Sequence, residues 1–238
     1  MKKVTILLHG LGQKGTGYFD ELVPKLELCQ DLVMNVELFN RTKKIPSWKE
    51  WVDEAELVIA QYIDEDTQVT LIGYSMGALI AVYLSTKFKV HKMILLAPAF
   101  YILGLHVFAR VWKMLIKPHK SHEPNEVFSM IREHIIWNPL YYFNFLIMMI
   151  KMRNHTKTIQ CPTKIYLGTE DELIPLKSVQ SIIKQMIHGV KVIIISGGRH
   201  ELLVHAPINS FVLRDIIEFM LSESEHNFEV SLESIQTF

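Results

Sequence analysis

The chain has 238 residues, of which 49% are apolar and 21% are charged, and it carries 25 basic and 25 acidic side chains. This length fits one large α/β domain, and the balanced charge gives no case for nucleic acid as a partner. The chain has only two cysteines, Cys29 and Cys161, without C-x-x-C spacing. They argue against a disulfide framework or a zinc site and indicate a reduced, cytoplasmic protein.

The first predicted strand is VTILLHG, residues 4–10, an aliphatic run that a glycine ends. Such a run is typical of a strand buried on both faces. It is too short for the apolar core of a signal peptide, so we interpret the N-terminus as part of the fold. No stretch of about 18 uncharged apolar residues occurs, and no transmembrane helix is expected.

The next elements alternate between strand and helix. A weaker strand is predicted at 33–40, and a helix at 47–63, where Ser47 and Glu50 form an S-x-x-E capping box. A strong strand at 68–75 then leads directly into an apolar helix at 76–88.

The second half continues the same pattern. Strands are predicted at 91–99, 162–168 and 190–198, with a helix that begins at Pro175 and a last helix at 207–221. Alternating helices and continuously hydrophobic strands indicate a mostly parallel sheet with helices on both faces. In such sheets ligands bind at the carboxyl ends of the strands.

The sequence GYSMG, residues 73–77, lies between the strong strand and the apolar helix. It is a G-x-S-x-G pattern in the strand-turn-helix setting that a nucleophile elbow requires. The sharp turn exposes the Ser75 hydroxyl at a helix N-terminus, where free N–H groups favour negative charge. The alternative is a glycine-rich turn with a serine that only caps the helix.

A nucleophilic serine needs a histidine base and an acid that orients it. His200 follows the predicted strand 190–198 directly and is the preferred base, with His205 as the alternate. His9 also ends a strand, but it precedes a glycine-rich turn.

The acid should lie between the serine and the histidine in chain order. Three carboxylates, Glu170, Asp171 and Glu172, follow the strand 162–168. Their position at a strand end indicates that one of them is the orienting acid, and the residues alone leave open which one.

Two backbone N–H groups are needed to stabilise the oxyanion that forms during acyl transfer. One is expected from Met76, the residue after the serine, and the other from the loop in LLHGLGQKG. Gly10, Gly12 and Gly15 also fit G-x-G-x-x-G, a nucleotide-binding pattern. That alternative lacks an acidic residue at the end of the second strand and leaves the Ser75 motif unexplained.

Taken together, the motifs LLHGLG, GYSMG, GTEDELIP and SGGRH resemble those of the α/β-hydrolases, in the order of that family and over almost the whole chain. Within the family the chain is similar to small bacterial carboxylesterases and monoacylglycerol lipases. The resemblance implies Ser75 as nucleophile, Asp171 as acid and His200 as base. It also implies Leu11 and Met76 as oxyanion donors. The sequence departs from the family's S-G-H, because Gly198 and Arg199 precede His200.

The resemblance further implies a hydrolase core at 1–99 and 161–221 and a helical cap at 100–160 inserted between two late strands. The remaining segment, 222–238, is treated as a C-terminal tail that can be mobile and that the sequence does not place in the fold. The cap segment is oily, and its predicted substrate contacts are Phe100, Tyr101, Trp137 and Tyr141. It carries eight basic and three acidic side chains. This charge favours weak contact with an anionic membrane surface or an acidic acyl substrate, and a solvated helical face explains it equally well.

We therefore expect a cofactor-free and metal-free serine hydrolase that cleaves carboxylic esters of short to medium acyl chains or of the monoacylglycerol type, with a small-molecule ester as its partner. The same triad is also compatible with an amidase or aminopeptidase, a thioesterase or an acyltransferase. From a different class, the chain could be a binding protein on a hydrolase scaffold.

Overall fold

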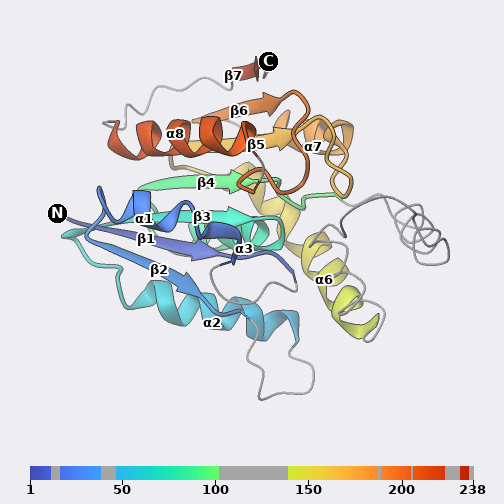
Figure 1. The fold of residues 1–238 in the computed structure, drawn as a ribbon. Coiled ribbons are helices and arrows are strands. Elements are labelled where there is room, and N and C mark those ends of the chain that lie inside the picture. Colours follow the sequence, from blue (N-terminus) through green and yellow to red (C-terminus); the bar gives the residue numbers. More distant parts are fainter. Residues whose placement is uncertain are drawn as a thin grey trace.

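The computed structural model describes residues 1–11, 17–38, 47–101, 139–186, 189–204, 206–222 and 231–235. In this part of the chain, seven parallel strands form one sheet in the order β2-β1-β3-β4-β5-β6-β7 (Figure 1). The strands are β1 (Lys2–Leu8), β2 (Leu32–Val36), β3 (Thr67–Tyr74), β4 (Lys92–Leu96), β5 (Thr163–Gly168), β6 (Val190–Ile195) and β7 (Ser231–Ile235). The predicted parallel sheet is confirmed.

Helices cover both faces of this sheet. The described helices are η1 (Gly17–Phe19), α1 (Val23–Leu26), α2 (Trp48–Ala60), α3 (Met76–Lys87), α6 (Pro139–Met152), η3 (Arg153–Thr158), α7 (Leu176–Ile183) and α8 (Ile208–Leu221). Buried side chains of α2, α3, α6 and α7 share one hydrophobic cluster. Those of η1, α1 and α8 share the other, on the opposite face (Figure 1).

The strands are buried on both sides because their side chains alternate between the two clusters. In β1, Ile6 and Leu8 belong to the cluster with α2 and α3, whereas Leu7 belongs to the cluster with α8. Leu71 and Ile72 of β3 divide in the same way. This explains why the central strands read as continuous hydrophobic runs rather than as alternating ones.

Local signals set the helix starts as the sequence indicates. Ser47 accepts a hydrogen bond from the Glu50 N–H, while the Glu50 carboxylate accepts one from the Ser47 N–H, so the predicted capping box is present. Pro175 and Pro207 occupy the N-cap positions of α7 and α8. The predicted helix at 47–63 ends earlier, at Ala60.

The strand order reverses at β1 and β3, and ligands bind at the carboxyl ends of the strands at such a point. The chain passes from β1 to β2 on one side and returns to β3 on the other, so these neighbours form the point where the order reverses. Loops that follow β1, β3, β5 and β6 meet at this edge of the sheet. They carry His9, Ser75, Asp171 and His200.

The predicted cap is described only in part. Helix α6 follows β4 and precedes β5 in the chain, as the predicted insertion requires. Its buried side chains Tyr142, Phe145, Met148, Met149 and Met152 join the cluster with α2 and α3, and the helix packs on those two helices. Residues 102–138 lie outside the described residues, so a cap over the site stays a prediction.

The C-terminal segment contributes more to the sheet than the sequence indicates. The tail was expected from residue 222 onward, outside the core, but Ser231–Ile235 forms β7 and pairs in parallel with β6. An edge strand has a neighbour on one side only, so it needs no long hydrophobic run. Its short, half-polar sequence therefore gave a weak signal. Within the described residues, none of the helices is long and apolar enough to cross a membrane.

Candidate active site

Ser75 sits on a sharp turn between β3 and α3. Its backbone dihedral angles are φ 51° and ψ −108°, a conformation that non-glycine residues rarely adopt. The Ser75 N–H donates to the Leu96 carbonyl at 2.9 Å, and the Ser75 carbonyl accepts from the Ala99 N–H at 3.1 Å. Its side chain makes no capping hydrogen bond to α3, so Ser75 is not the helix-capping serine of the alternative interpretation.

The two glycines of the GYSMG motif allow backbone segments to approach closely. A Cβ atom on Gly77 would lie 2.0 Å from the Leu8 carbonyl oxygen, and one on Gly73 would lie 2.5 Å from the Ala78 Cα. Neither contact can be relieved by a side-chain rotation, because the neighbouring atoms belong to the backbone. The glycines therefore let the first turn of α3 pack directly on the end of β1.

The three side chains expected from the resemblance lie in one hydrogen-bonded row. The His200 Nε2 is 3.1 Å from the Ser75 Oγ, and the His200 Nδ1 is 2.9 Å from the Asp171 Oδ2. With the proton on Nδ1 donated to Asp171, Nε2 is free to accept the Ser75 hydroxyl proton. The structure brings together residues that are 125 and 29 positions apart in the sequence.

Asp171 is held by more than the histidine. Its Oδ1 accepts hydrogen bonds from the backbone N–H groups of Leu173 at 2.9 Å and Ile174 at 2.7 Å. Only 2% of the Asp171 side chain and 3% of the His200 side chain are exposed. The carboxylate is thus fixed in a loop that leaves Oδ2 for His200. Of the three candidate acids, Asp171 is the one in contact with the imidazole.

Several effects of opposite sign act on the pKa of His200. Burial lowers the pKa of His200, but the charge and hydrogen bond of Asp171 raise it, as do the charges of Glu172 and Glu201. The net result is a pKa above the ordinary value of 6.5. An imidazole in this position takes up a proton readily, as a base for a hydroxyl group must.

Glu172 and Arg199 join the loop that carries Asp171 to the loop that carries His200. The Arg199 Nη2 donates to the Glu172 Oε1 at 3.1 Å, and the His200 backbone N–H donates to the Glu172 Oε2 at 3.3 Å. In the sequence, Glu172 is one of three candidate acids and Arg199 is a departure from the S-G-H pattern. The signal for their pairing was present as two opposite charges, each adjacent to an expected catalytic residue.

His9 has a different role from His200. Its side chain is buried, its Nδ1–H donates to the Gly10 carbonyl at 2.8 Å, and its Nε2 accepts from the Leu38 N–H at 3.1 Å. Burial lowers the pKa of His9, so this imidazole stays neutral at pH 7. It ties the end of β1 to the chain that follows β2.

The loop after β1 runs beside the nucleophile elbow. A Cβ atom on Gly10 would lie 2.9 Å from the Tyr74 ring and 3.4 Å from the Ser75 Cβ. The next residue, Leu11, packs against the core cluster that includes Met76. In these positions the backbone N–H groups of Leu11 and Met76 can both face one oxyanion. Their role as oxyanion donors stays a prediction. Gly12 and Gly15 of the alternative G-x-G-x-x-G lie outside the described residues.

An aromatic pair, which the sequence did not indicate, flanks the base. The rings of Tyr18 and Tyr74 stack with centroids 3.5 Å apart, and the Tyr74 ring lies 5.2 Å from the His200 ring. Both tyrosines are buried, and burial raises their pKa well above the ordinary value. They therefore remain neutral and form an apolar wall on one side of His200.

The expected substrate contacts fall in different surroundings. Phe100 is fully buried in the core cluster, whereas 39% of Tyr101 is exposed and its ring lies 5.8 Å from the Arg153 guanidinium. Tyr141 belongs to α6, but its side chain is outside the described part, as are Trp137 and the alternate base His205. Contact of these residues with substrate stays a prediction. No group of His, Cys, Asp or Glu among the described residues could hold a metal ion.

Comparisons with known proteins were made on both sequence and structure. The sequence model of the Alpha/beta hydrolase family matches residues 5–209. No curated protein sequence matches the chain significantly.

Three solved structures with the same fold illustrate the structural likeness. A monoacylglycerol lipase from Paleococcus ferrophilus is 16% identical, with a TM-score of 0.67 over 91% of this chain and 93% of that one. A soluble variant of the monoglyceride lipase from Saccharomyces cerevisiae, in complex with a substrate analogue, is 13% identical, with a TM-score of 0.69 over 92% and 86%. Est1E from Butyrivibrio proteoclasticus is 18% identical, with a TM-score of 0.63 over 92% and 87%.

Proposed function

Because the chain belongs to the Alpha/beta hydrolase family, we propose that it is a serine hydrolase that cleaves carboxylic esters through an acyl-enzyme on Ser75. The observation that supports this most directly is the row from Ser75 through His200 to Asp171, with separations of 3.1 and 2.9 Å. A serine on a strained turn, an aligned base and a buried acid are the parts that nucleophilic catalysis needs.

In the proposed reaction the Ser75 Oγ attacks the ester carbonyl carbon while His200 Nε2 takes the hydroxyl proton. Asp171 holds the imidazole with its proton on Nδ1 and stabilises the imidazolium that forms. The backbone N–H groups of Leu11 and Met76 stabilise the tetrahedral oxyanion. His200 then gives its proton to the departing alcohol. Water attacks the acyl-enzyme with the help of the same base, releasing the acid and restoring Ser75.

Two observations support a proposed substrate class: the names of similar structures and the composition of the segment before β5. Two of the similar structures are, by name, a monoacylglycerol lipase and a monoglyceride lipase. By composition, the 100–160 segment is rich in aromatic and methionine side chains of the kind that suit an acyl chain, although Phe100, Phe145 and the methionines of α6 pack in the core cluster. We therefore assign esters of short to medium acyl chains and monoacylglycerol-like esters as the substrates.

The deciding experiment is hydrolysis of p-nitrophenyl esters from acetate to palmitate, alongside amino-acid anilides and acyl-CoA thioesters. Turnover that is fastest on one range of the oxygen esters supports the proposal, and the preferred chain length reports the depth of the acyl pocket. Faster turnover of anilides or thioesters would replace it with an amidase or a thioesterase. No turnover of any of them would favour a protein that only binds.

The pH dependence of kcat/KM is expected to show a single acidic limb with a midpoint above 6.5. The base must be neutral to accept the Ser75 proton, and the pKa of His200 is raised above its ordinary value. Lowering the pH through this raised pKa protonates Nε2, so activity falls at a higher pH than an unperturbed histidine would give. A pH–rate profile from pH 5 to 9 in buffers of constant ionic strength tests this. Activity that stays flat down to pH 5 would contradict a histidine base.

Replacing Glu172 with glutamine is expected to move that acidic limb to lower pH. The negative charge of Glu172 is one of the causes that raise the pKa of His200, and the substitution removes it while keeping the shape of the side chain. The measurement is the same pH–rate profile. Glu170→Gln is the matched control, since Glu170 is an exposed carboxylate in the same loop and does not contribute to the shift. Equal shifts in the two variants would contradict a specific role for Glu172.

A further inference from the structure

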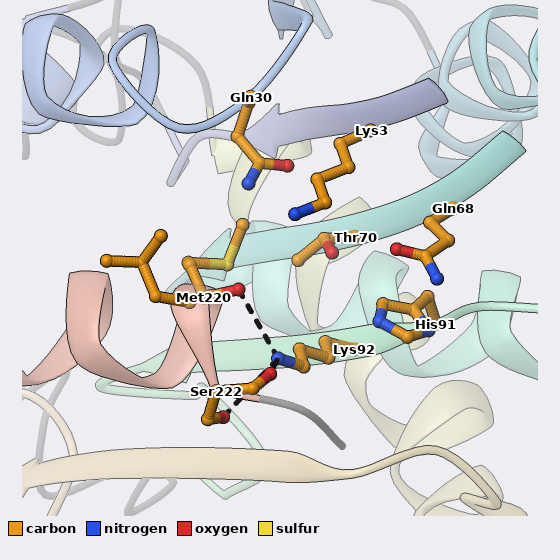
Figure 2. Close-up of a pocket in the computed structure, with 9 residues that line it drawn as sticks. Lys3, Gln30, Gln68, Thr70, His91, Lys92, Met220 and Ser222 are labelled. Atoms are coloured by element: carbon orange, nitrogen blue, oxygen red, sulfur yellow. Dashed lines mark hydrogen bonds between the residues drawn. The ribbon is translucent and has the colours of Figure 1, made fainter. Parts of the chain in front are cut away.

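A second concave region lies at the amino ends of the strands, the edge of the sheet opposite to Ser75. It is a cavity of about 360 Å³ between the starts of β1, β3 and β4 and the last turn of α8 (Figure 2). Its polar walls come from Lys3, Gln30, Gln68, Thr70, His91 and Lys92. The proposed hydrolase reaction uses none of these residues.

The charge of this cavity is positive. Two of the residues that line it are lysines, and none is acidic. The neighbouring acid on α8, Asp215, is already paired with Lys164 at 2.9 Å and accepts from the Tyr166 hydroxyl at 2.5 Å. An anion that entered the cavity would therefore meet two ammonium groups and no lining carboxylate.

Lys92 gives the cavity a buried charge at a fixed position. The residue is 1% exposed, and its Nζ donates to the carbonyls of Phe219 at 2.7 Å and Ser222 at 2.5 Å. A further bond to the Met220 carbonyl at 3.4 Å helps to hold the C-terminal turn of α8 on the sheet, and Figure 2 shows the bonds of Lys92 to Met220 and Ser222. Burial lowers the pKa of Lys92, and the charges of Lys3 and Lys164 lower it further. Because its protons are donated to oxygens at the end of α8, Lys92 acts on a ligand through its charge and not through a further hydrogen bond.

Lys3 supplies a charge that is available to a ligand. Its backbone N–H donates to the Asp31 Oδ2 at 2.6 Å, but across the described segments its ammonium group has no hydrogen-bond or ion-pair partner. Figure 2 shows the ammonium end of Lys3 directed into the space beside Gln30 and Thr70. Thr5, Thr70 and Lys92 occupy paired positions on β1, β3 and β4. The hydroxyl of Thr70 therefore lies in the same row as the Lys92 side chain.

We propose that this cavity binds a small oxyanion of the phosphate class. Lysine ammonium groups bind phosphate oxygens as point charges, and the hydroxyl of Thr70 adds a neutral donor. The cavity has no arginine fork of the kind that recognises a planar carboxylate in a bidentate way. Its volume of about 360 Å³ is roughly twelve times the ~30 Å³ that one water occupies in the liquid. It therefore admits either free phosphate or the phosphate group of a small organic ester.

The test is calorimetric titration of the full chain at pH 7 with inorganic phosphate and, separately, with glycerol phosphate, at an ionic strength held constant with sodium chloride. We expect saturable binding of one anion per chain and a rise in Tm beyond that in chloride alone. Tighter binding of the ester would identify an organic phosphate as the occupant, and equal or weaker binding would identify the free ion. Heat without saturation, or no rise in Tm over chloride, would overturn the proposal.

Variants of adjacent lysines separate a site from general charge effects. Lys3→Gln is expected to weaken phosphate binding by about tenfold or more, because it removes a charge-assisted hydrogen bond. Lys2→Gln removes the same charge one residue away, where the ammonium lies 5.7 Å from the Tyr62 ring, and is expected to leave binding within about twofold. Equal weakening by the two variants would overturn the proposal.

A further variant tests the proposed phosphate site without changing any lysine. Thr70→Val keeps the size and the β-branched shape of the side chain while removing its hydroxyl, and is expected to weaken phosphate binding several-fold with the same Tm in chloride. Unchanged binding in both Lys3→Gln and Thr70→Val would show that the anion binds elsewhere. Lys92 is left intact in these experiments because its ammonium holds the end of α8.

Discussion

Replacing Ser75 with alanine is expected to lower kcat for p-nitrophenyl ester hydrolysis by on the order of 10⁴- to 10⁶-fold. The substitution removes the oxygen that is proposed to attack the ester carbonyl, while His200 and Asp171 keep their hydrogen bond to each other. What remains is the rate that binding and oxyanion stabilisation alone can give. KM should change little, since the hydroxyl group contributes little to substrate affinity. Steady-state kinetics on the preferred ester tests both parts.

The matched control is Ser85→Ala, which removes a hydroxyl from the same helix. The Ser85 Oγ donates to the Val82 carbonyl at 2.8 Å, and this variant should keep full activity. A Ser75→Ala protein that retained more than a tenth of the wild-type kcat would contradict the acyl-enzyme on this residue. A fluorophosphonate that labels Ser75 in a wild-type protein without esterase activity would indicate a narrow substrate. Absence of labelling would instead favour a scaffold that binds without catalysis.

Replacing Gly77 with alanine is expected to destabilise the protein by about 3 kcal/mol or more. The added Cβ would lie 2.0 Å from the Leu8 carbonyl oxygen, 2.4 Å from the Leu8 carbonyl carbon and 2.7 Å from the His9 carbonyl oxygen. These are backbone atoms at the end of a central strand, so α3 must move away from the sheet. For a chain of this length the loss corresponds to a fall in Tm of roughly 6–12 °C.

The same movement is expected to lower kcat by about 10²-fold, because it displaces Ser75 and the Met76 N–H from the His9–Leu11 loop. Thermal unfolding and ester kinetics measure the two effects. Gly17→Ala is the control, since a Cβ atom there would meet nothing within 4 Å and neither Tm nor kcat should change by much. If Gly77→Ala proved as stable and active as Gly17→Ala, close packing of α3 on β1 could not be the reason for this glycine.

Features that depend on neighbouring residues could be predicted from the sequence. The capping box of α2 is complete within Ser47–Glu50, and the strand, glycine and serine order of the elbow lies within 68–77. The parallel sheet followed from strands that are apolar throughout. From the order of the strands and the rule that ligands bind at their carboxyl ends, the positions of Ser75, Asp171 and His200 at one edge could also be inferred.

Features that depend on contacts between distant loops could not be predicted from the sequence. Arg199 and Glu172 are 27 residues apart, and whether they meet depends on how two loops leave β5 and β6. The stacking of Tyr18 on Tyr74 requires the path of the chain after β1. The hydrogen bonds of Lys92 reach residues 127 and 130 positions away. Opposite charges beside the expected acid and base mark Glu172 and Arg199 as candidates for a pair, but no local pattern of composition or spacing shows that such distant residues meet.

The position of β7 has a consequence for the behaviour of the protein at high concentration. Without β7, the edge of the sheet would be β6, whose sequence VKVIII is β-branched in five of six positions. An exposed edge of that kind is a template for pairing with other chains, the first step of aggregation. The strand that covers it, SLESI, has two serines and a glutamate among its five residues. The C-terminal segment thus gives the sheet a polar outer strand and protects a hydrophobic one from intermolecular pairing.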